Sequence, residues 1–313
     1  MVDDQPKENA LAQPVLPKSY DLSNTNELIS LLKDEDEAEI KVHLANHLQK
    51  IFDKANLPDY RLVLLYDDDF TINQFHSNQI YEAVSKFDKK YNILMVIVSD
   101  GGKIEPAYLI SKTCKRLSKS KFVVSVPRKA KSAATLICLG ADEIHMGLLS
   151  ELGPIDPQFG GFPALGLANA LEKITALSSK FPNASEMFAK YLTANLNLRD
   201  LGYFERINES AAQYAQRLLQ GKTFTDGKTA ETLADHFTNH YKDHGFVIDA
   251  DEASHLLGVQ YVKEGTKEYE IGNDIYRFFQ FFSLLFNIFK SKTVRYVGSI
   301  ENGFDSNAKK EKD

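Results

Sequence analysis

Residues 91–102 read YNILMVIVSDGG, and this stretch decides the fold. Residues 91–99 are almost entirely apolar, which is typical of a strand buried on both faces of a parallel sheet. The Asp-Gly-Gly that follows ends the strand in a turn, and helical spacing of apolar residues begins at about Pro106. The stretch therefore predicts a buried strand, a glycine turn and a helix in succession.

The same alternation continues on both sides of this stretch. We predict further strands at residues 61–66, 121–127 and 143–146 and helices at residues 73–86, 106–117 and 132–139. Continuous apolar strands that alternate with helices are the signature of a mostly parallel sheet covered on both faces. The predicted fold class is therefore α/β.

The rest of the chain is expected to be mainly helical. Helical spacing recurs at residues 24–55, 165–177, 186–197, 205–219, 230–241, 251–258 and 273–290, with a short extended piece at 245–248. The expected organisation is a disordered leader (1–22), N-terminal helices (23–57), the α/β domain (58–262), a C-terminal helical extension (263–301) and a disordered tail (302–313).

Composition excludes several classes of protein. The 313 residues include 37 Lys and Arg against 43 Asp and Glu, a formal net charge of −6, whereas a general nucleic-acid binder needs the opposite balance. The two cysteines, Cys114 and Cys138, are too few for a disulfide framework, so we expect both to be reduced and the protein to be cytoplasmic.

No membrane-targeting segment is expected. Residues 1–18 are polar and lack the apolar region of a secretory signal. The most apolar stretch, residues 275–289, is too short to span a bilayer and contains Arg277, Gln280 and Asn287.

Two strand-to-helix junctions place small residues where a helix begins. The first is Ser99-Asp100-Gly101-Gly102 and the second is residues 130–134, AKSAA. A helix start presents unpaired N–H groups, and paired glycines let a ligand approach the backbone. Ser132 Oγ and the N–H groups of Gly102 and Ala133 would then surround one substrate carbonyl. The plainer alternatives are a turn for the glycines and a helix cap for the serine.

The sequence resembles the serine dehydrogenase proteinase family, which belongs to the Clp/crotonase-like superfamily and is related to signal peptide peptidase A. The resemblance covers roughly residues 60–262. It is carried by residues 96–102 (VIVSDGG), 122–128 (FVVSVPR), 130–137 (AKSAATLI), 140–147 (GADEIHMG), 152–158 (LGPIDPQ) and 241–248 (YKDHGFVI).

This resemblance implies a Clp/crotonase-like α/β core with extra terminal helices, acting as a serine peptidase on polypeptides without a cofactor. Ser132 would be the nucleophile, and Gly101, Gly102 and Ala133 would surround the oxyanion. One departure is Asp100, which stands where related peptidases usually have proline. A carboxylate there opposes a developing oxyanion unless it points away.

The sequence leaves several candidates for the general base. The position where Clp peptidases carry their histidine is here Asp156, which we expect to fix the loop between Pro154 and Pro157. A Ser–Lys dyad, as in the signal peptide peptidase relatives, would use Lys173 or Lys242, and His244 offers an imidazole. The plainer alternatives are a solvated helix face for Lys173 and a helix-end histidine for His244.

A metal site is a weaker alternative. His236, His240 and His244 are spaced four residues apart, but three ligands along one straight helix would lie too far apart for one ion. The sequence also lacks the Gly-x-Ser-x-Gly, phosphate-loop and His-Glu-x-x-His motifs, so ATP would have to come from a partner.

The interpretation that the sequence favours is a serine peptidase that works through an acyl-enzyme on Ser132. The alternatives are a non-catalytic scaffold with the same fold and a crotonase-type enzyme acting on acyl-thioesters. The final helix shows almost no polar face, and relatives commonly form trimers or rings, so we expect a homo-oligomer whose contacts include that helix.

Overall fold

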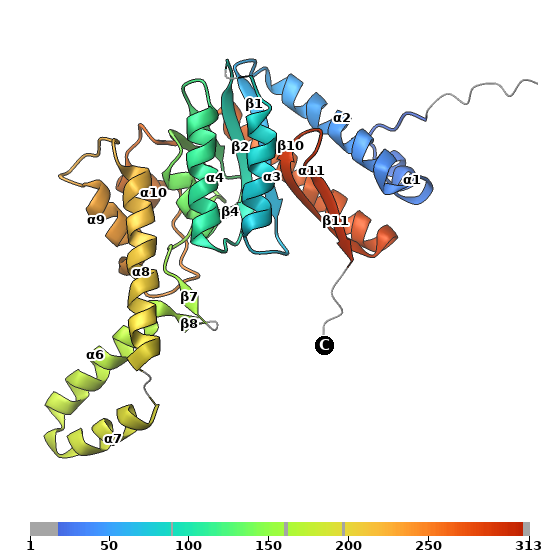
Figure 1. Cartoon of the computed structure of the whole chain (residues 1–313). Coiled ribbons are helices and arrows are strands. Elements are labelled where there is room, and N and C mark those ends of the chain that lie inside the picture. Colours follow the sequence, from blue (N-terminus) through green and yellow to red (C-terminus); the bar gives the residue numbers. More distant parts are fainter. Residues whose placement is uncertain (1–17, 89, 160–161, 196–197, 309–313) are drawn as a thin grey trace, which may run out of the picture.

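The computed structural model describes residues 18–88, 90–159, 162–195 and 198–308 (Figure 1). Its main sheet has the strand order β11-β10-β1-β2-β3-β5-β9. Strands β1 (Tyr60–Asp67), β2 (Asn92–Ser99), β3 (Phe122–Ser125), β5 (Glu143–His145) and β9 (Val262–Lys263) run parallel. The mostly parallel α/β sheet predicted from the apolar strands is confirmed.

Helices cover both faces of this sheet, because its strands bury side chains alternately to either side. Val63 and Leu65 face one helical layer, and Leu62 and Leu64 face the other. The first layer contains α3 (Gln74–Ser85), α4 (Ile104–Leu117), α5 (Ala133–Leu139), α8 (Leu198–Leu219), α9 (Ala230–Asp235) and α10 (Ala250–Leu257). The second contains α1 (Thr25–Asp34), α2 (Glu37–Ala55) and α11 (Lys267–Lys290).

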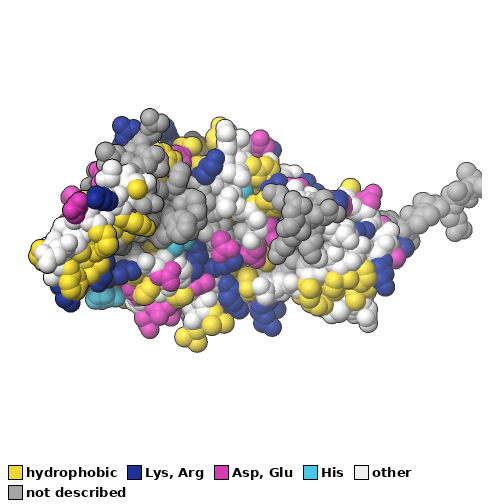
Figure 2. Space-filling view, turned by 90° about the horizontal axis from the view of Figure 1, so that it is seen from below, with side chains coloured by type: hydrophobic (Ala, Val, Ile, Leu, Met, Phe, Trp, Pro, Cys, Tyr) yellow, Lys and Arg dark blue, Asp and Glu magenta, His cyan; other side chains and the backbone are white. Residues whose placement is uncertain are grey.

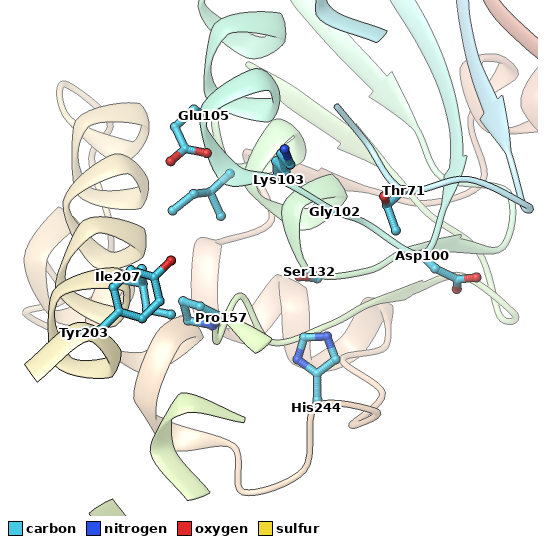
Figure 3. Close-up of a pocket in the computed structure, with 11 residues that line it drawn as sticks. Thr71, Asp100, Gly102, Lys103, Glu105, Ser132, Pro157, Tyr203, Ile207 and His244 are labelled. Carbon is cyan, nitrogen blue, oxygen red and sulfur yellow. The ribbon is translucent and has the colours of Figure 1, made fainter. Parts of the chain in front are cut away.

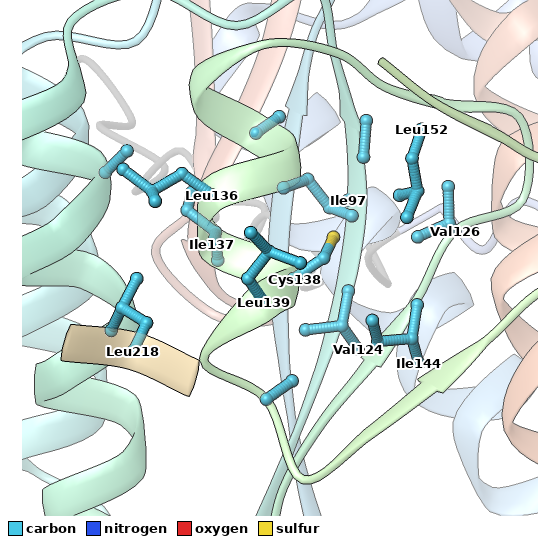
Figure 4. Packing of buried hydrophobic residues seen from close by; sticks show 14 of the residues in the cluster. Ile97, Val124, Val126, Leu136, Ile137, Cys138, Leu139, Ile144, Leu152 and Leu218 are labelled. Atoms are coloured by element: carbon cyan, nitrogen blue, oxygen red, sulfur yellow. The ribbon is translucent and has the colours of Figure 1, made fainter. Parts of the chain in front are cut away.

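Helix α5 is the most deeply buried element of the first layer. Every residue of this helix is buried. Leu136, Ile137 and Cys138 lie among side chains from β2, β3, β5 and α8 (Figure 4). Dense packing on all sides fixes the helix, and so the turn that leads into it, in one position.

The C-terminal region differs from the expected helical extension and tail. After α11 the chain forms β10 (Lys292–Ser299), antiparallel to β1, and β11 (Phe304–Ala308), antiparallel to β10. Val294 and Tyr296 are buried and alternate with the half-buried Thr293 and Arg295, as expected of a strand with one face toward the core. Residues 309–313 of the expected tail lie outside the described residues.

The end of the expected leader packs against the N-terminal helices. Tyr20 Oη donates a hydrogen bond to Glu35 at 2.7 Å, and Leu22 is buried. The ordered region therefore begins before residue 23, while residues 1–17 of the leader lie outside the described residues.

A helical arm projects from the core next to the sheet's carboxyl ends (Figure 1). It follows a hairpin of β7 (Gln158–Phe159) and β8 (Phe162–Pro163) and contains α6 (Ala164–Lys180), the 3-10 turn Pro182–Ala184 and α7 (Ser185–Asn195). Helix α8 then returns to the core. Phe181, Met187 and Tyr191 are exposed on the arm, where Figure 2 shows hydrophobic side chains gathered.

None of the helices placed in the four described ranges is both long enough and apolar enough to cross a membrane.

Lys222 caps the end of α5 opposite to Ser132. Its Nζ donates a hydrogen bond to the Ala141 carbonyl and lies 4.8 Å from the centre of the Tyr261 ring. A cation at this end of α5 is stabilised by the negative end of the helix dipole. Burial nevertheless lowers the pKa of Lys222 from its ordinary value to about 8.

The burial of Lys222 makes the free energy of unfolding depend on pH. Because the pKa is lower in the folded than in the unfolded chain, the unfolded chain binds more protons between about pH 8 and 10.5. We expect the contribution of Lys222 to the free energy of unfolding to rise with pH across this window, by about 3 kcal/mol at most.

Urea unfolding at pH 7.5 and pH 10 of the wild type and Lys222→Met measures this rise, which the variant should lose. Lys190→Met, at an exposed lysine of α7, is the matched control and should leave the rise intact. Equal pH dependence in the wild type and Lys222→Met would contradict the expectation.

Candidate active site

The two strand-to-helix junctions meet at the carboxyl ends of the central strands. Ser99 at the end of β2 pairs with Ala130 of the short strand β4 (Lys129–Ala130), and the Lys131 N–H donates to the Ser99 carbonyl at 3.0 Å. A Cβ on Gly101, whose φ is +99°, would lie only 2.7 Å from Ser132 Cβ. Only glycine therefore lets the two junctions come this close.

Ser132 occupies a strained turn. Its φ of 52° and ψ of −119° are values that residues other than glycine rarely adopt. Its side chain makes no capping hydrogen bond to α5, so it does not serve as a helix cap. A serine on a sharp, strained turn between a strand and a helix is the arrangement of the nucleophile elbow, although the Gly-x-Ser-x-Gly motif is absent.

Two backbone N–H groups next to Ser132 have no hydrogen-bond acceptor within the described ranges. One belongs to Ala133, the first residue of α5, and the other to Gly102. The chain around Gly102 is fixed by Ile72, which donates to the Gly101 carbonyl at 2.7 Å and accepts from the Lys103 N–H at 2.8 Å. The Gly101 N–H donates to Ser99 Oγ at 3.1 Å, so it is already paired.

Ser132 lines a cavity of about 800 Å³ (Figure 3). Gly102 and Lys103 line one side, Tyr203 and Ile207 of α8 form the opposite wall, and His244 closes the cavity below Ser132. The cavity thus brings the Ser132 side chain and the His244 imidazole to the same space.

His244 pairs with Asp156. The distance between His244 Nδ1 and Asp156 Oδ1 is 2.7 Å, and the Asp156 side chain is 3% exposed against 29% for His244. An ionised carboxylate can only accept a hydrogen bond, so Nδ1 carries the proton and Nε2 remains free to accept one. Asp156, which the sequence suggests only as loop support, therefore also contacts an imidazole.

A pair of backbone hydrogen bonds brings these two residues together. Leu152, in β6 (Glu151–Leu152), and Ile248 exchange N–H···O bonds of 2.9 and 3.1 Å. This bridge places residues 88 positions apart side by side.

The two lysine candidates lie elsewhere. Lys173 is exposed on α6 in the arm, and Lys242 is exposed beside the site. Neither is among the residues that line the cavity with Ser132.

Asp100 turns away from Ser132 and pairs with Lys129 Nζ at 2.8 Å (Figure 3). Lys129 also lies 3.3 Å from Asp68, whose pKa is raised by burial. The charge that could oppose an oxyanion is therefore directed to a neighbouring cation.

The other histidines form a separate pair. The rings of His236 and His240 stack with centres 4.1 Å apart, and His236 Nε2 lies 3.2 Å from Tyr241 Oη. Burial lowers the pKa of His236, and neighbouring His240 lowers it further. His244 lies outside this stack, and no described set of three His, Cys, Asp or Glu side chains is arranged to hold a metal ion.

Sequence reasoning missed the cavity walls and Lys131. Tyr203 and Ile207 are four residues apart, which places them on one face of α8, but nothing in the sequence indicates that this face lines the same cavity as Ser132. Lys131 belongs to the stretch 130–137 that carries the family resemblance, yet its contacts follow only from the three-dimensional structure.

Comparison with known proteins gives two curated relatives, both from Methanocaldococcus jannaschii. The uncharacterized protein MJ0137 is 32% identical over 127 residues, which are 41% of this chain and 41% of the relative. The uncharacterized protein MJ1495 is 30% identical over 124 residues, which are 40% and 39% of the two chains. The matched region spans about two-fifths of the length of each relative.

Two solved structures of variants of the 1510-N membrane-bound stomatin-specific protease also share similarity. One aligns with a TM-score of 0.41 and 15% identity over 72% of this chain and 83% of that chain. The other, in complex with a substrate peptide, has a TM-score of 0.42 and 14% identity over 80% and 89% of the two chains.

The family comparison matches residues 23–183 to the ClpP-like SDH-type serine proteinases. This range includes Gly102, Ser132 and Asp156 and ends before His244. The match covers more than half of the chain, and the chain belongs to the ClpP-like SDH-type serine proteinase family.

Proposed function

We propose that this protein hydrolyses polypeptides with Ser132 as nucleophile, His244 as general base and Asp156 as the group that orients the imidazole. The observation that carries the proposal is the strained serine in a cavity shared with a histidine whose Nδ1 is bonded to a buried carboxylate. A serine hydroxyl needs such a neighbour, because it is a weak nucleophile until its proton is removed.

In this proposal the proton of Ser132 Oγ passes to His244 Nε2 while Oγ attacks the peptide carbonyl. His244 then donates that proton to the leaving amine, which leaves an acyl-enzyme on Ser132. Water attacks the ester with His244 again as base, and the carboxylic acid product departs. The Asp156 side chain keeps its hydrogen bond to Nδ1 and so orients and stabilises the imidazolium that forms in each step.

The oxyanion of each tetrahedral intermediate would be stabilised by the N–H groups of Gly102 and Ala133. Ala133 also brings the positive end of the α5 dipole to this point. Gly101 contributes space rather than a donor, because its N–H is bonded to Ser99 Oγ.

Two other functions remain distinguishable by experiment. A non-catalytic scaffold would keep the fold without an activated serine, and a crotonase-type enzyme would use the same N–H groups on an acyl-thioester. The His244–Asp156 pair favours the peptidase, because thioester chemistry on a bare oxyanion hole does not need it. The reduced, buried Cys114 and Cys138 support a cytoplasmic location, and folded substrates would need an ATP-hydrolysing partner to unfold them.

We also propose that the protein is a homo-oligomer and that α11 contributes to the contact. Most apolar side chains of this helix are covered by the sheet and the N-terminal helices. Phe281, Leu284 and Ile288 remain exposed at a spacing of three and four residues, which places them in one stripe. A hydrophobic patch lies at the end of the molecule that contains α11 (Figure 2).

Ser132→Ala should abolish both casein hydrolysis and labelling by a fluorophosphonate, because it removes the nucleophile. Ser132→Gly should abolish both as well, yet be more stable than Ser132→Ala by about 1 kcal/mol, since glycine adopts the strained φ and ψ freely. Residual labelling in either variant would move the nucleophile elsewhere, and an unlabelled wild type would favour the scaffold.

His244→Ala should lower kcat by roughly a thousandfold or more, and Asp156→Asn by a similar factor, because each removes part of the proton-transfer pair. Lys173→Ala and Lys242→Ala are the matched controls and should keep kcat within about twofold of the wild type. A large loss in either lysine variant alone would instead favour a Ser–Lys dyad.

Leu284→Glu should reduce the mass measured by light scattering, because it places a charge in the centre of the exposed stripe. Leu109→Glu on α4, an equally exposed leucine on the opposite side of the sheet, is the control and should leave the mass unchanged. A monomeric wild type, or an unchanged mass for Leu284→Glu, would contradict an interface on α11.

A further inference from the structure

Lys131, the residue directly before the nucleophile, ties together the segments that carry the rest of the site. Its Nζ lies 2.8 Å from Glu151 Oε2, 3.1 Å from the Phe246 carbonyl and 3.3 Å from the Leu152 carbonyl. The side chain is only 14% exposed.

These contacts match the donors of the Lys131 side chain. An ammonium group has three N–H donors, and here it meets three acceptors, one of them a carboxylate. The ammonium is therefore directed at these segments and away from the hydroxyl of Ser132.

The acceptors belong to the segments that position the base. Phe246 lies two residues after His244, and Glu151 and Leu152 precede Asp156 by a few positions. The Leu152–Ile248 bridge joins these two segments to each other, and the pairing of β4 with β6 attaches the segment before Asp156 to the nucleophile turn. Lys131 adds a direct contact from this turn to the segment that carries His244, because its Nζ reaches the Phe246 carbonyl. Its own backbone is fixed, since its N–H is bonded to Ser99 and its carbonyl accepts from the Ala134 N–H at the start of α5.

The path of the Lys131 side chain is also enclosed. A Cβ on Gly153 would lie 2.7 Å from Lys131 Cδ, so glycine at this position leaves the space through which the side chain passes. The ammonium thereby reaches across β6 to the loop that contains His244.

We propose that Lys131 is a positioning residue that holds the His244–Asp156 pair in register with Ser132. The inference rests on the proposed function, because it assigns the lysine a task in that mechanism. Displacement of a catalytic group by about 1 Å can lower the rate a hundredfold, so loss of this tether should act on kcat more than on KM.

Lys131→Cys followed by alkylation with 2-bromoethylamine tests the role, because it restores an ammonium on a side chain of the same length. Cys114 and Cys138 are buried, so reaction should be confined to the new thiol. We expect Lys131→Cys to lower kcat and the rate of fluorophosphonate labelling at least tenfold with KM within about threefold, and alkylation to restore most of the loss. Lys190→Cys, at an exposed lysine of α7, is treated identically as the control and should leave kcat unchanged before and after alkylation.

Gly153→Ala provides a second test that leaves the lysine in place. Its Cβ would displace the Lys131 side chain, and we expect a loss of kcat in the same direction. Unchanged kcat in Lys131→Cys, or a loss that alkylation does not reverse in a protein with wild-type circular dichroism, would overturn the proposal.

Hydrogen exchange separates this inference from the proposed function. Amides of residues 244–248 should exchange faster in Lys131→Cys than in the wild type, and alkylation should slow them again, whether or not the protein hydrolyses peptides. Unlabelled wild-type protein would reject the catalytic proposal, and unchanged exchange in Lys131→Cys would reject the tether.

Discussion

The hydrogen bond between the Lys131 N–H and the Ser99 carbonyl is the contact on which the whole site depends. It joins the ends of β2 and β4, and so brings the glycine turn against the serine turn. Once the two turns touch, position 101 has no room for a side chain and Ser132 must adopt a positive φ. The strain is sustained because α5, which follows directly, is buried along its whole length and cannot shift to relax it.

Two lysines, on either side of Ala130, lie next to the turn that carries Ser132, and each has its own acidic partners. Lys129 meets Asp100 and Asp68 on one side, and Lys131 meets Glu151 on the other. Because both cations are neutralised locally, the field at Ser132 is left to the backbone N–H groups and the helix dipole. The aspartate at position 100, where related peptidases usually have proline, is thereby accommodated by a lysine on the adjacent strand β4.

The sheet and the turn at Ser132 can be predicted from the sequence because local patterns encode them: apolar runs such as residues 91–99, and small residues after a strand. The pairing of Asp156 with His244 cannot be predicted in this way, because it depends on a bridge between Leu152 and Ile248 that no local pattern specifies. Strand β10 is not predicted either, because Val294 and Tyr296 follow a long helix and their apolar spacing resembles its continuation. Which face of α8 meets the cavity also follows only from packing.

Helix α8 joins the helical arm to the core of the protein as one continuous helix. Its first half leaves the arm, Tyr203 and Ile207 form the cavity wall, and Ala211, Ala215 and Leu218 are buried against α4 and α5. A helix of this length spans about 33 Å and bends little. A partner that binds the exposed hydrophobic surface of the arm and displaces it would therefore also tilt the part of α8 that forms the cavity wall facing Ser132.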